Sequence, residues 1–341
     1  MRGSKVSFLL LVVFALLVSQ AMPAGSITWG VPDGNLHPNV GAFVIAIQTP
    51  EGSGNRQVCT GSLIHERAFL TAGHCPVLSE RFFGATCPDD VMVTFDPAID
   101  DNGDRFVDPD VLLYRVASCR LHPQFKFQTT GAGATDTHDI AVLILKKAVT
   151  GITPLGLPPS GFLDALYDAG RLVNGNPGTT SFLAVGYGNQ EFEPPQHHDR
   201  DGLRRMVNME FQALLEPWLR LSQVHTPGQD DSGGTCGGDS GGPGFWVEVD
   251  GRETLVSITS WGDTNCVASD FRYRLDTPGS LSFIHSVIDG LYATGNTTAA
   301  VMGRSYAGAT NTLMLAPGAD HIGEVQAWHV DTGKRVWTHT F

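Results

Sequence analysis

The sequence predicts an all-β fold made of antiparallel barrels, and three observations lead to this prediction. The 341 residues include 40 glycines and 20 prolines, which favour many turns and short strands over long helices. Short apolar runs recur between these turns. Amphipathic helices that would connect parallel strands are scarce between the runs, so antiparallel pairing fits better.

The predicted strands are apolar runs bounded by turn-forming residues. In chain order they cover residues 40–48, 63–71, 91–95, 111–116, 140–145, 182–185, 245–249 and 254–260.

One helix is predicted near the end of this series, over residues 280–292. It follows Thr277-Pro278-Gly279, and we expect it to dock on the barrels and close the domain. Its apolar residues recur at helical spacing: Leu281, Ile284, Val287, Ile288 and Leu291.

The N-terminus predicts a secretory signal peptide over residues 1–26. Arg2 and Lys5 precede an apolar run, and a stretch of small and polar residues follows it. A membrane anchor would need nearer to about 20 apolar residues. Small residues at Ala24 and Ser26 suit cleavage before Ile27, and a cut after Ala21 stays open. We therefore expect an extracellular or periplasmic protein.

The charge and the cysteines narrow the function classes. The 22 basic and 35 acidic side chains give a net charge of −13, the wrong sign for binding phosphate backbones or anionic lipid. We expect no nucleic acid partner, and no membrane partner after signal cleavage. The six cysteines form no Cys-x-x-Cys pair, so in a secreted chain they indicate disulfides rather than metal ligands.

Three short segments carry candidate chemistry. His74 lies in Thr71-Ala72-Gly73-His74-Cys75 after a predicted strand, Asp139 opens another strand, and Ser240 lies in the glycine-rich turn Gly238-Asp239-Ser240-Gly241-Gly242-Pro243. Alone, each has an ordinary structural explanation. Together they have the chain order His, Asp, Ser of the chymotrypsin-type catalytic triad.

These motifs make residues 27–293 resemble the chymotrypsin/trypsin-like serine endopeptidases. The resemblance implies two antiparallel six-stranded barrels with a C-terminal helix. It also implies that Ser240 is the nucleophile, that His74 is its general base, and that Asp139 orients the imidazole. The backbone N–H groups of Gly238 and Ser240 would form the oxyanion hole.

The resemblance also assigns a substrate-binding region. Ser260-Trp261-Gly262 would pair with the substrate backbone. Counting back from Ser240 without a gap places Gly234 at the pocket base, where trypsin-like members carry an Asp. We therefore predict cleavage after apolar rather than basic residues. The predicted substrate-binding residues are Gly234, Thr235, Gly237, Ser260, Trp261 and Gly262.

The sequence leaves two candidates for the residue that forms the back wall of this pocket. A one-residue gap before Tyr273 decides whether Phe271 or Arg272 faces inward. Phe271 would shorten the pocket and keep it apolar. Arg272 would favour an acidic side chain, which is the second choice for specificity.

Disulfide pairing and activation follow from the same resemblance. It pairs Cys59 with Cys75 and Cys236 with Cys266, which leaves Cys87 for Cys119. Ile27-Thr28-Trp29-Gly30 is similar to the family's freed N-terminus, whose amine pairs with an Asp at the position of Asp239. No Lys or Arg lies between Lys5 and Ile27, so we predict that signal cleavage itself activates the enzyme.

Two further segments carry weaker predictions. Asp100, Asn102, Asp104 and Asp108 are spaced like a calcium loop, but Arg105 and Val111 replace residues that such loops need. We expect an acidic solvated insertion, with structural calcium as the alternative, and no other metal or cofactor.

The last segment, residues 294–341, is expected to be a flexible or loosely packed tail, or else a docking segment. Residues 325–337 are similar to one strand-turn-strand repeat of quinoprotein-type β-propellers. One such repeat cannot bury its own apolar face.

Two function classes follow. The first is a secreted serine endopeptidase that acts as a monomer on protein or peptide substrates. The second is a catalytically inactive, protease-like binding protein. Such proteins usually lose a residue of the triad, whereas His74, Asp139 and Ser240 are all present. The enzyme is therefore the preferred interpretation.

Overall fold

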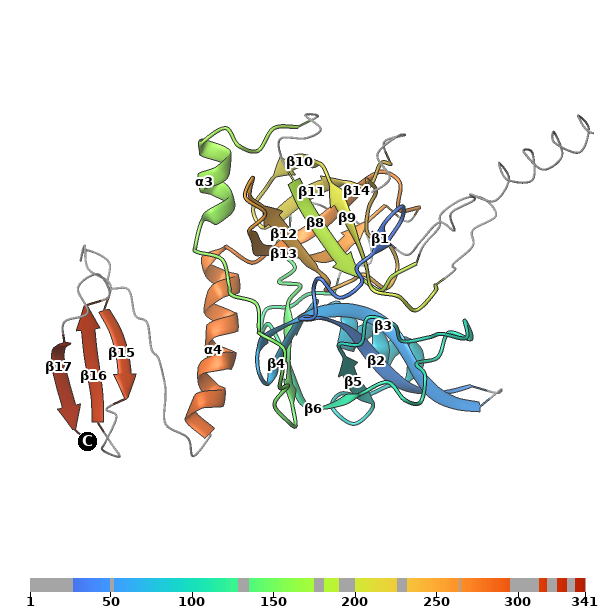
Figure 1. The fold of residues 1–341 in the computed structure, drawn as a ribbon, viewed down its shortest axis with the longest axis horizontal. Coiled ribbons are helices and arrows are strands. Elements are labelled where there is room, and N and C mark those ends of the chain that lie inside the picture. The colour runs from blue at the N-terminus through green and yellow to red at the C-terminus, as the bar shows by residue number, and fades with distance from the viewer. Residues whose placement is uncertain are drawn as a thin grey trace, which may run out of the picture.

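The chain folds mainly into two β-barrels, shown one above the other in Figure 1. The structure, a computed structural model, describes residues 27–49, 52–127, 135–174, 181–189, 200–225, 232–263 and 265–294, and three strands within residues 313–340. The predicted signal peptide lies outside the described residues. The predicted all-β fold with a C-terminal helix is confirmed.

The first barrel is closed and has six antiparallel strands in the order β2-β3-β4-β7-β6-β5. Its interior is filled by side chains such as Phe43, Phe69 and Leu143. The run predicted as one strand over residues 63–71 is two strands, because the chain turns at Glu66-Arg67. The strands are β2 (Val40–Thr49), β3 (Gly52–His65), β4 (Ala68–Thr71), β5 (Val91–Thr94), β6 (Tyr114–Leu121) and β7 (Ala141–Leu145).

The second barrel is one sheet in the order β1-β9-β8-β12-β13-β14-β11-β10. Only Glu210 separates β9 from β10, so one bent strand supplies β10 at one edge of the sheet and β9, next to the short β1, at the other. Counting it once, and setting aside the two-residue β1, leaves the six predicted strands. Their bounds are β1 (Val31–Pro32), β8 (Ser181–Gly186), β9 (Arg205–Met209), β10 (Phe211–Leu214), β11 (Trp218–Ser222), β12 (Pro243–Val247), β13 (Glu253–Gly262) and β14 (Ser269–Arg274).

Three helices lie outside the barrels in the described residues: α2 (His74–Phe83), α3 (Phe162–Asp168) and α4 (Pro278–Thr294). The predicted late helix is confirmed as part of α4. It packs on the main core through Phe283, Ile284, Val287, Ile288 and Leu291. No described helix is both long and apolar enough to span a bilayer.

Arg204 joins the two barrels through a buried ion pair. Its Nε donates to Asp33 Oδ2 at 2.8 Å, and both side chains are fully buried. Its Nη1 donates to the carbonyl oxygens of Val40 and Phe95 in the first barrel. Removing one partner of such a pair leaves an uncompensated buried charge, which costs about 3–5 kcal/mol. The interface between the barrels therefore depends on this guanidinium.

Three disulfides, Cys59–Cys75, Cys87–Cys119 and Cys236–Cys266, use all six cysteines in the pairing that the resemblance implies. Disulfides of this kind fit an oxidising compartment.

The C-terminal segment holds an antiparallel sheet of its own, in the order β15-β16-β17. The strand-turn-strand predicted over residues 325–337 falls in β16 and β17. Among the described strands, none of the three pairs with a barrel strand. They are β15 (Leu313–Pro317), β16 (Glu324–His329) and β17 (Arg335–Thr340).

Candidate active site

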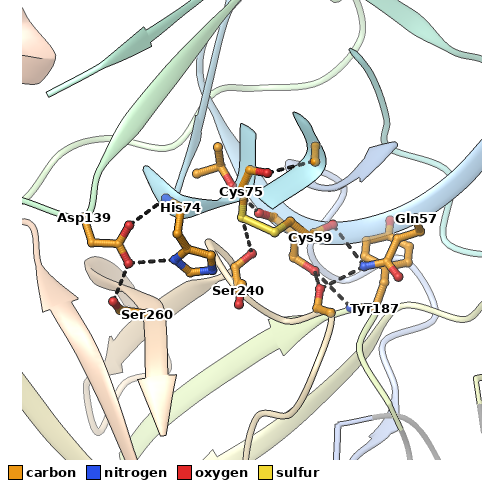
Figure 2. The surroundings of a disulfide bond; sticks show 12 residues. Gln57, Cys59, His74, Cys75, Asp139, Tyr187, Ser240 and Ser260 are labelled. Carbon is orange, nitrogen blue, oxygen red and sulfur yellow. Dashed lines mark hydrogen bonds and ion pairs between the residues drawn. A yellow bond between two sulfur atoms is a disulfide. The ribbon is translucent and has the colours of Figure 1, made fainter. Parts of the chain in front are cut away.

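The candidate catalytic residues meet where the two barrels face each other. His74 begins α2 directly after β4, and Asp139 precedes β7, so the first barrel supplies both. Ser240 comes from the turn before β12 in the second barrel. Figure 2 shows the imidazole of His74 between the carboxylate of Asp139 and Ser240. His74 and Ser240 also line one cavity.

Asp139 fixes the position of His74 with both of its oxygens. Oδ2 lies 2.8 Å from Nδ1 of His74, and Oδ1 accepts the backbone N–H of His74 at 2.8 Å. The hydroxyl of Ser260 donates a further hydrogen bond to Oδ2. Because an ionised carboxylate only accepts, Nδ1 carries the proton in a neutral ring. Nε2 is then the basic nitrogen.

The electrostatics keep Asp139 ionised. Burial raises the pKa of Asp139, but the charge of His74 and the hydrogen bonds from His74 and Ser260 outweigh it and hold that pKa below 3.8. Burial lowers the pKa of His74, but the charge of Asp139 and their hydrogen bond bring it above 6.5. The pair can therefore stabilise an imidazolium once His74 takes a proton.

The turn at residues 238–240 points two N–H groups away from the protein's own acceptors. The carbonyl of Gly237 accepts hydrogen bonds from Asn189 and Arg200, and that of Asp239 accepts from Gly242. In a planar trans peptide the N–H points opposite to the C=O. The N–H groups of Gly238 and Ser240 consequently point the other way, and neither makes a backbone hydrogen bond in the described residues.

Gly238 is required in this turn. Its φ of +103° is a conformation that residues with a side chain rarely adopt. Its carbonyl accepts hydrogen bonds from Gln57 Nε2 at 2.8 Å and from Thr60 Oγ1 at 2.9 Å, both on β3. The backbone N–H of Thr60 binds the carbonyl of Ser240 at 2.9 Å. The first barrel thus holds the turn that carries Ser240.

Asp239 is a fully buried carboxylate beside this turn. It accepts the N–H groups of Gly188 at 2.7 Å and Cys236 at 2.9 Å. A Cβ added at Gly186 or Gly188 would lie 2.2 or 2.3 Å from its oxygens, so glycine is required at both positions. Burial raises the pKa of Asp239 to about 7. Among the described residues, no cation lies within ion-pair distance of it.

Ile27, the predicted partner of Asp239, is fully buried in the core of the second barrel. The next residue, Thr28, pairs with Gly234, and its hydroxyl donates to the carbonyl of Gly234 at 3.0 Å. This segment therefore docks beside the predicted pocket base in the uncut chain. No contact between Ile27 and Asp239 is present, so their pairing stays a prediction.

The predicted pocket base is polar and crowded. Gln223 crosses it: a Cβ added to Gly234 would lie 2.5 Å from Cγ of Gln223. The side-chain amide of Gln223 donates to the carbonyl of Thr235 at 2.7 Å, and Thr235 Oγ1 donates to Asp270 Oδ2 at 2.9 Å. Sequence reasoning did not identify Gln223 or Asp270, because neither belongs to a recognised motif.

The two candidate residues for the back wall, Phe271 and Arg272, make contacts elsewhere. Phe271 stacks on Trp261, with ring centroids 3.8 Å apart. Arg272 is fully buried and forms an ion pair with Asp270 at 2.9 Å. Asp270, rather than Phe271 or Arg272, is the residue that binds Thr235. The carboxylate of Asp270 is thus paired through Oδ2, whereas its Oδ1 is buried without a hydrogen-bond partner among the described residues.

The acidic loop at residues 100–108 uses its carboxylates internally. Asp100 accepts the backbone N–H groups of Gly103, Asp104 and Arg105. Asp108 likewise accepts the N–H of Asp101 and the amide of Asn102. The calcium alternative stays a prediction.

One group of metal-ligand side chains lies close together in the described part of the chain, namely Cys59, His74 and Cys75. Both of its sulfurs belong to a disulfide, so they are not available to a metal.

Comparisons with known proteins agree with this geometry. The family model described as Trypsin matches residues 35–278. The chain is 26% identical to spermosin of Halocynthia roretzi over 242 residues, which cover 67% of this chain and 55% of spermosin. It is 27% identical to trypsin of Simulium vittatum over 272 residues, which cover 78% of this chain and 96% of that trypsin.

The match to lectizyme of Glossina austeni is 25% identity over 242 residues, covering 67% of this chain and 74% of lectizyme. The chain thus spans about half the length of spermosin and most of the length of the other two. Because the family model covers well over half of the 341 residues, the chain belongs to the trypsin family.

Proposed function

We propose that the protein is a secreted serine endopeptidase whose protease domain covers residues 27–293 and acts as a monomer on proteins or peptides. The observation that carries this proposal is the arrangement of His74 between Asp139 and Ser240, beside a turn with two unused N–H groups. The alternative, an inactive binding protein of the same fold, has no missing catalytic group to support it.

The geometry supports an acyl-enzyme mechanism. Oγ of Ser240 attacks the substrate carbonyl carbon while Nε2 of His74 takes the hydroxyl proton. The N–H groups of Gly238 and Ser240 stabilise the oxyanion, and the C–N bond breaks as His74 returns the proton to the leaving amine. Water then attacks the ester carbonyl while His74 again takes a proton, and the C–Oγ bond breaks as His74 returns that proton to Ser240. Asp139 stays ionised throughout and stabilises the imidazolium.

A serine-directed fluorophosphonate probe tests the proposal directly. We expect the secreted protein to be labelled covalently on Ser240, because only a serine activated by a base reacts rapidly. Labelling should disappear in Ser240→Ala, and Ser257→Ala should retain it. Intact-mass measurement reads the result. A correctly folded protein that stays unlabelled and cleaves no peptide would support the binding-protein alternative.

The pH dependence should report the pair of His74 and Asp139. His74 acts as a base only when neutral, so kcat/KM should rise with pH through a midpoint above 6.5. Asp139→Asn removes the charge that raises this pKa, so the midpoint should shift down and kcat/KM should fall by about 10⁴. Asp136→Asn is the control, because Asp136 contacts Tyr273 and His138 instead. An unchanged midpoint in Asp139→Asn would contradict the assignment.

Activation is proposed to require a free amine at Ile27. Asp239 is buried with a raised pKa, so a nearby ammonium would stabilise its ionised form and, with it, the turn at residues 238–240. A chain beginning at Ile27 should be fully active. A chain that retains Ser26 should have a kcat lower by roughly a hundredfold, and so should the Asp239→Asn variant. This is the effect of losing an oxyanion-hole donor. N-terminal sequencing of active secreted protein provides the check, and full activity with Met22 as first residue would refute the proposal.

Cleavage after apolar residues is proposed because, among the described residues, the carboxylate beside the pocket base is Asp270, which already forms an ion pair. Gly234 has no side chain, and Arg272 neutralises Asp270. A Lys or Arg side chain would lose hydration without gaining an ion pair, which costs several kcal/mol. A peptide library varied at the residue before the scissile bond should give the highest kcat/KM for apolar side chains. A maximum at Arg or Lys would mean that Asp270, Asp263 or an acid at 230–231 reaches the pocket.

A further inference from the structure

A cavity of about 310 Å³ extends from the catalytic residues away from the predicted pocket. It begins at His74 and Ser240, passes over the Cys59–Cys75 disulfide and reaches Arg56 and Arg200. Of the predicted substrate-binding residues, Gly237 lines it, whereas residues 234–235 and 260–262 do not. We call this cavity the arginine groove.

The arginine groove lies on the leaving-group side of the active site. Figure 2 shows Ser260 on one side of His74, and Gln57 and Cys59 on the other. Under the proposed function, the residues before the scissile bond bind along residues 260–262 and at the pocket. The residues after that bond must therefore extend across the disulfide into the arginine groove.

Arg56 and Arg200 bring positive charge that no acidic side chain of the described residues neutralises in an ion pair. Among the described residues, the acceptors of Arg200 are all neutral: Asn189 Oδ1, Gly237 O, and both the backbone and side-chain oxygens of Gln57. Arg56 forms no ion pair within the described residues. In a chain with net charge −13, two guanidinium groups without an ion pair among the described residues thus line the cavity beside Ser240.

The charges around Arg200 in the described part of the chain are mostly positive. Burial, Arg56 and Arg105 all lower the pKa of Arg200, to about 10, which still leaves it charged at neutral pH. Among the described residues, the acidic groups near it are Asp239, on the buried side, and Asp100, across an adjoining cavity. Both carboxylates already accept backbone N–H groups. Charge is therefore available for a ligand.

The opposite wall of the arginine groove is apolar and exposed. Phe82 and Phe83, at the end of α2, are 67% and 44% exposed, and Leu78 lies one turn earlier. Aromatic side chains can contact the apolar part of a peptide while a guanidinium binds its carboxylate. The two walls together fit a short acidic peptide segment.

We propose that the arginine groove selects substrates with an acidic side chain, Asp or Glu, within the first three residues after the scissile bond, and that Arg56 binds its carboxylate. This inference rests on the proposed protease function. The chemistry is a charge-assisted hydrogen bond between a half-buried guanidinium and a carboxylate. Because the groups are partly exposed, the preference must weaken as salt rises.

The test compares Glu with Gln, which has the same shape without the charge, at each of the three positions of a quenched fluorescent peptide. We expect kcat/KM for Glu to exceed that for Gln by about tenfold at one position in low salt, the size of one charge-assisted hydrogen bond. Arg56→Glu should abolish or reverse this ratio. Arg115→Glu, an equal charge change at an exposed site outside the arginine groove, should leave the ratio unchanged.

Binding by Ser240→Ala separates failure of this inference from failure of the protease proposal. Fluorescence anisotropy of the same peptides should give the Glu-to-Gln ratio whether or not the native protein cleaves them. A Glu preference without any cleavage by the native protein would uphold the arginine groove and refute the protease. Equal cleavage of Glu and Gln peptides at all three positions, or a ratio that survives Arg56→Glu, would overturn the arginine groove.

Discussion

The catalytic arrangement depends on hydrogen bonds that cross between the two barrels. His74 belongs to one barrel and Ser240 to the other, so their separation is set by how the barrels dock rather than by either fold alone. On β3, Thr60 donates hydrogen bonds to the carbonyls of both Gly238 and Ser240, and Gln57 donates a second hydrogen bond to the carbonyl of Gly238. Arg204 fixes the same interface on its other flank. Catalytic groups need placement to within a fraction of an ångström, and these contacts provide it.

Buried charged residues explain why some strands could be predicted from the sequence pattern and others could not. In the first barrel, the apolar runs at residues 40–48, 91–95 and 140–145 predicted β2, β5 and β7 closely, whereas the run at 111–116 covers only the start of β6. β14 was not predicted, because Asp270, Arg272 and Arg274 break its apolar pattern although all three are buried. Their charges are satisfied by ion pairs with one another, with Asp276 and with Asp164, more than a hundred residues earlier. The pattern shows neither these pairings nor the burial of the charged residues, and the Asp164 partner lies outside any local window, so the charged residues indicated a loop.

The same distinction separates the predicted site residues from those that were missed. His74, Asp139 and Ser240 lie in short motifs whose spacing is visible in the sequence. Arg200 and Gln223 have no motif, and their positions follow from contacts made only on folding. Arg200 meets Gln57 across 143 residues. Gln223 reaches the pocket because Gly234 leaves room for its side chain. Specificity is therefore less predictable than chemistry in this chain, since loops far apart in sequence build the surfaces that surround the motifs.

The two arginines of the arginine groove cannot have equivalent roles. Arg200 donates hydrogen bonds to Gln57, Asn189 and Gly237. The carbonyl of Gly237 belongs to the same peptide unit as the N–H of Gly238. A substrate carboxylate that drew Arg200 away would loosen the oxyanion turn and so weaken catalysis. Arg56 makes no such hydrogen bond in the described residues, so its side chain can move to a ligand without disturbing the oxyanion turn. Arg200 therefore supplies fixed positive potential, whereas Arg56 supplies the direct contact. Charge recognition and oxyanion stabilisation can then coexist within one cavity.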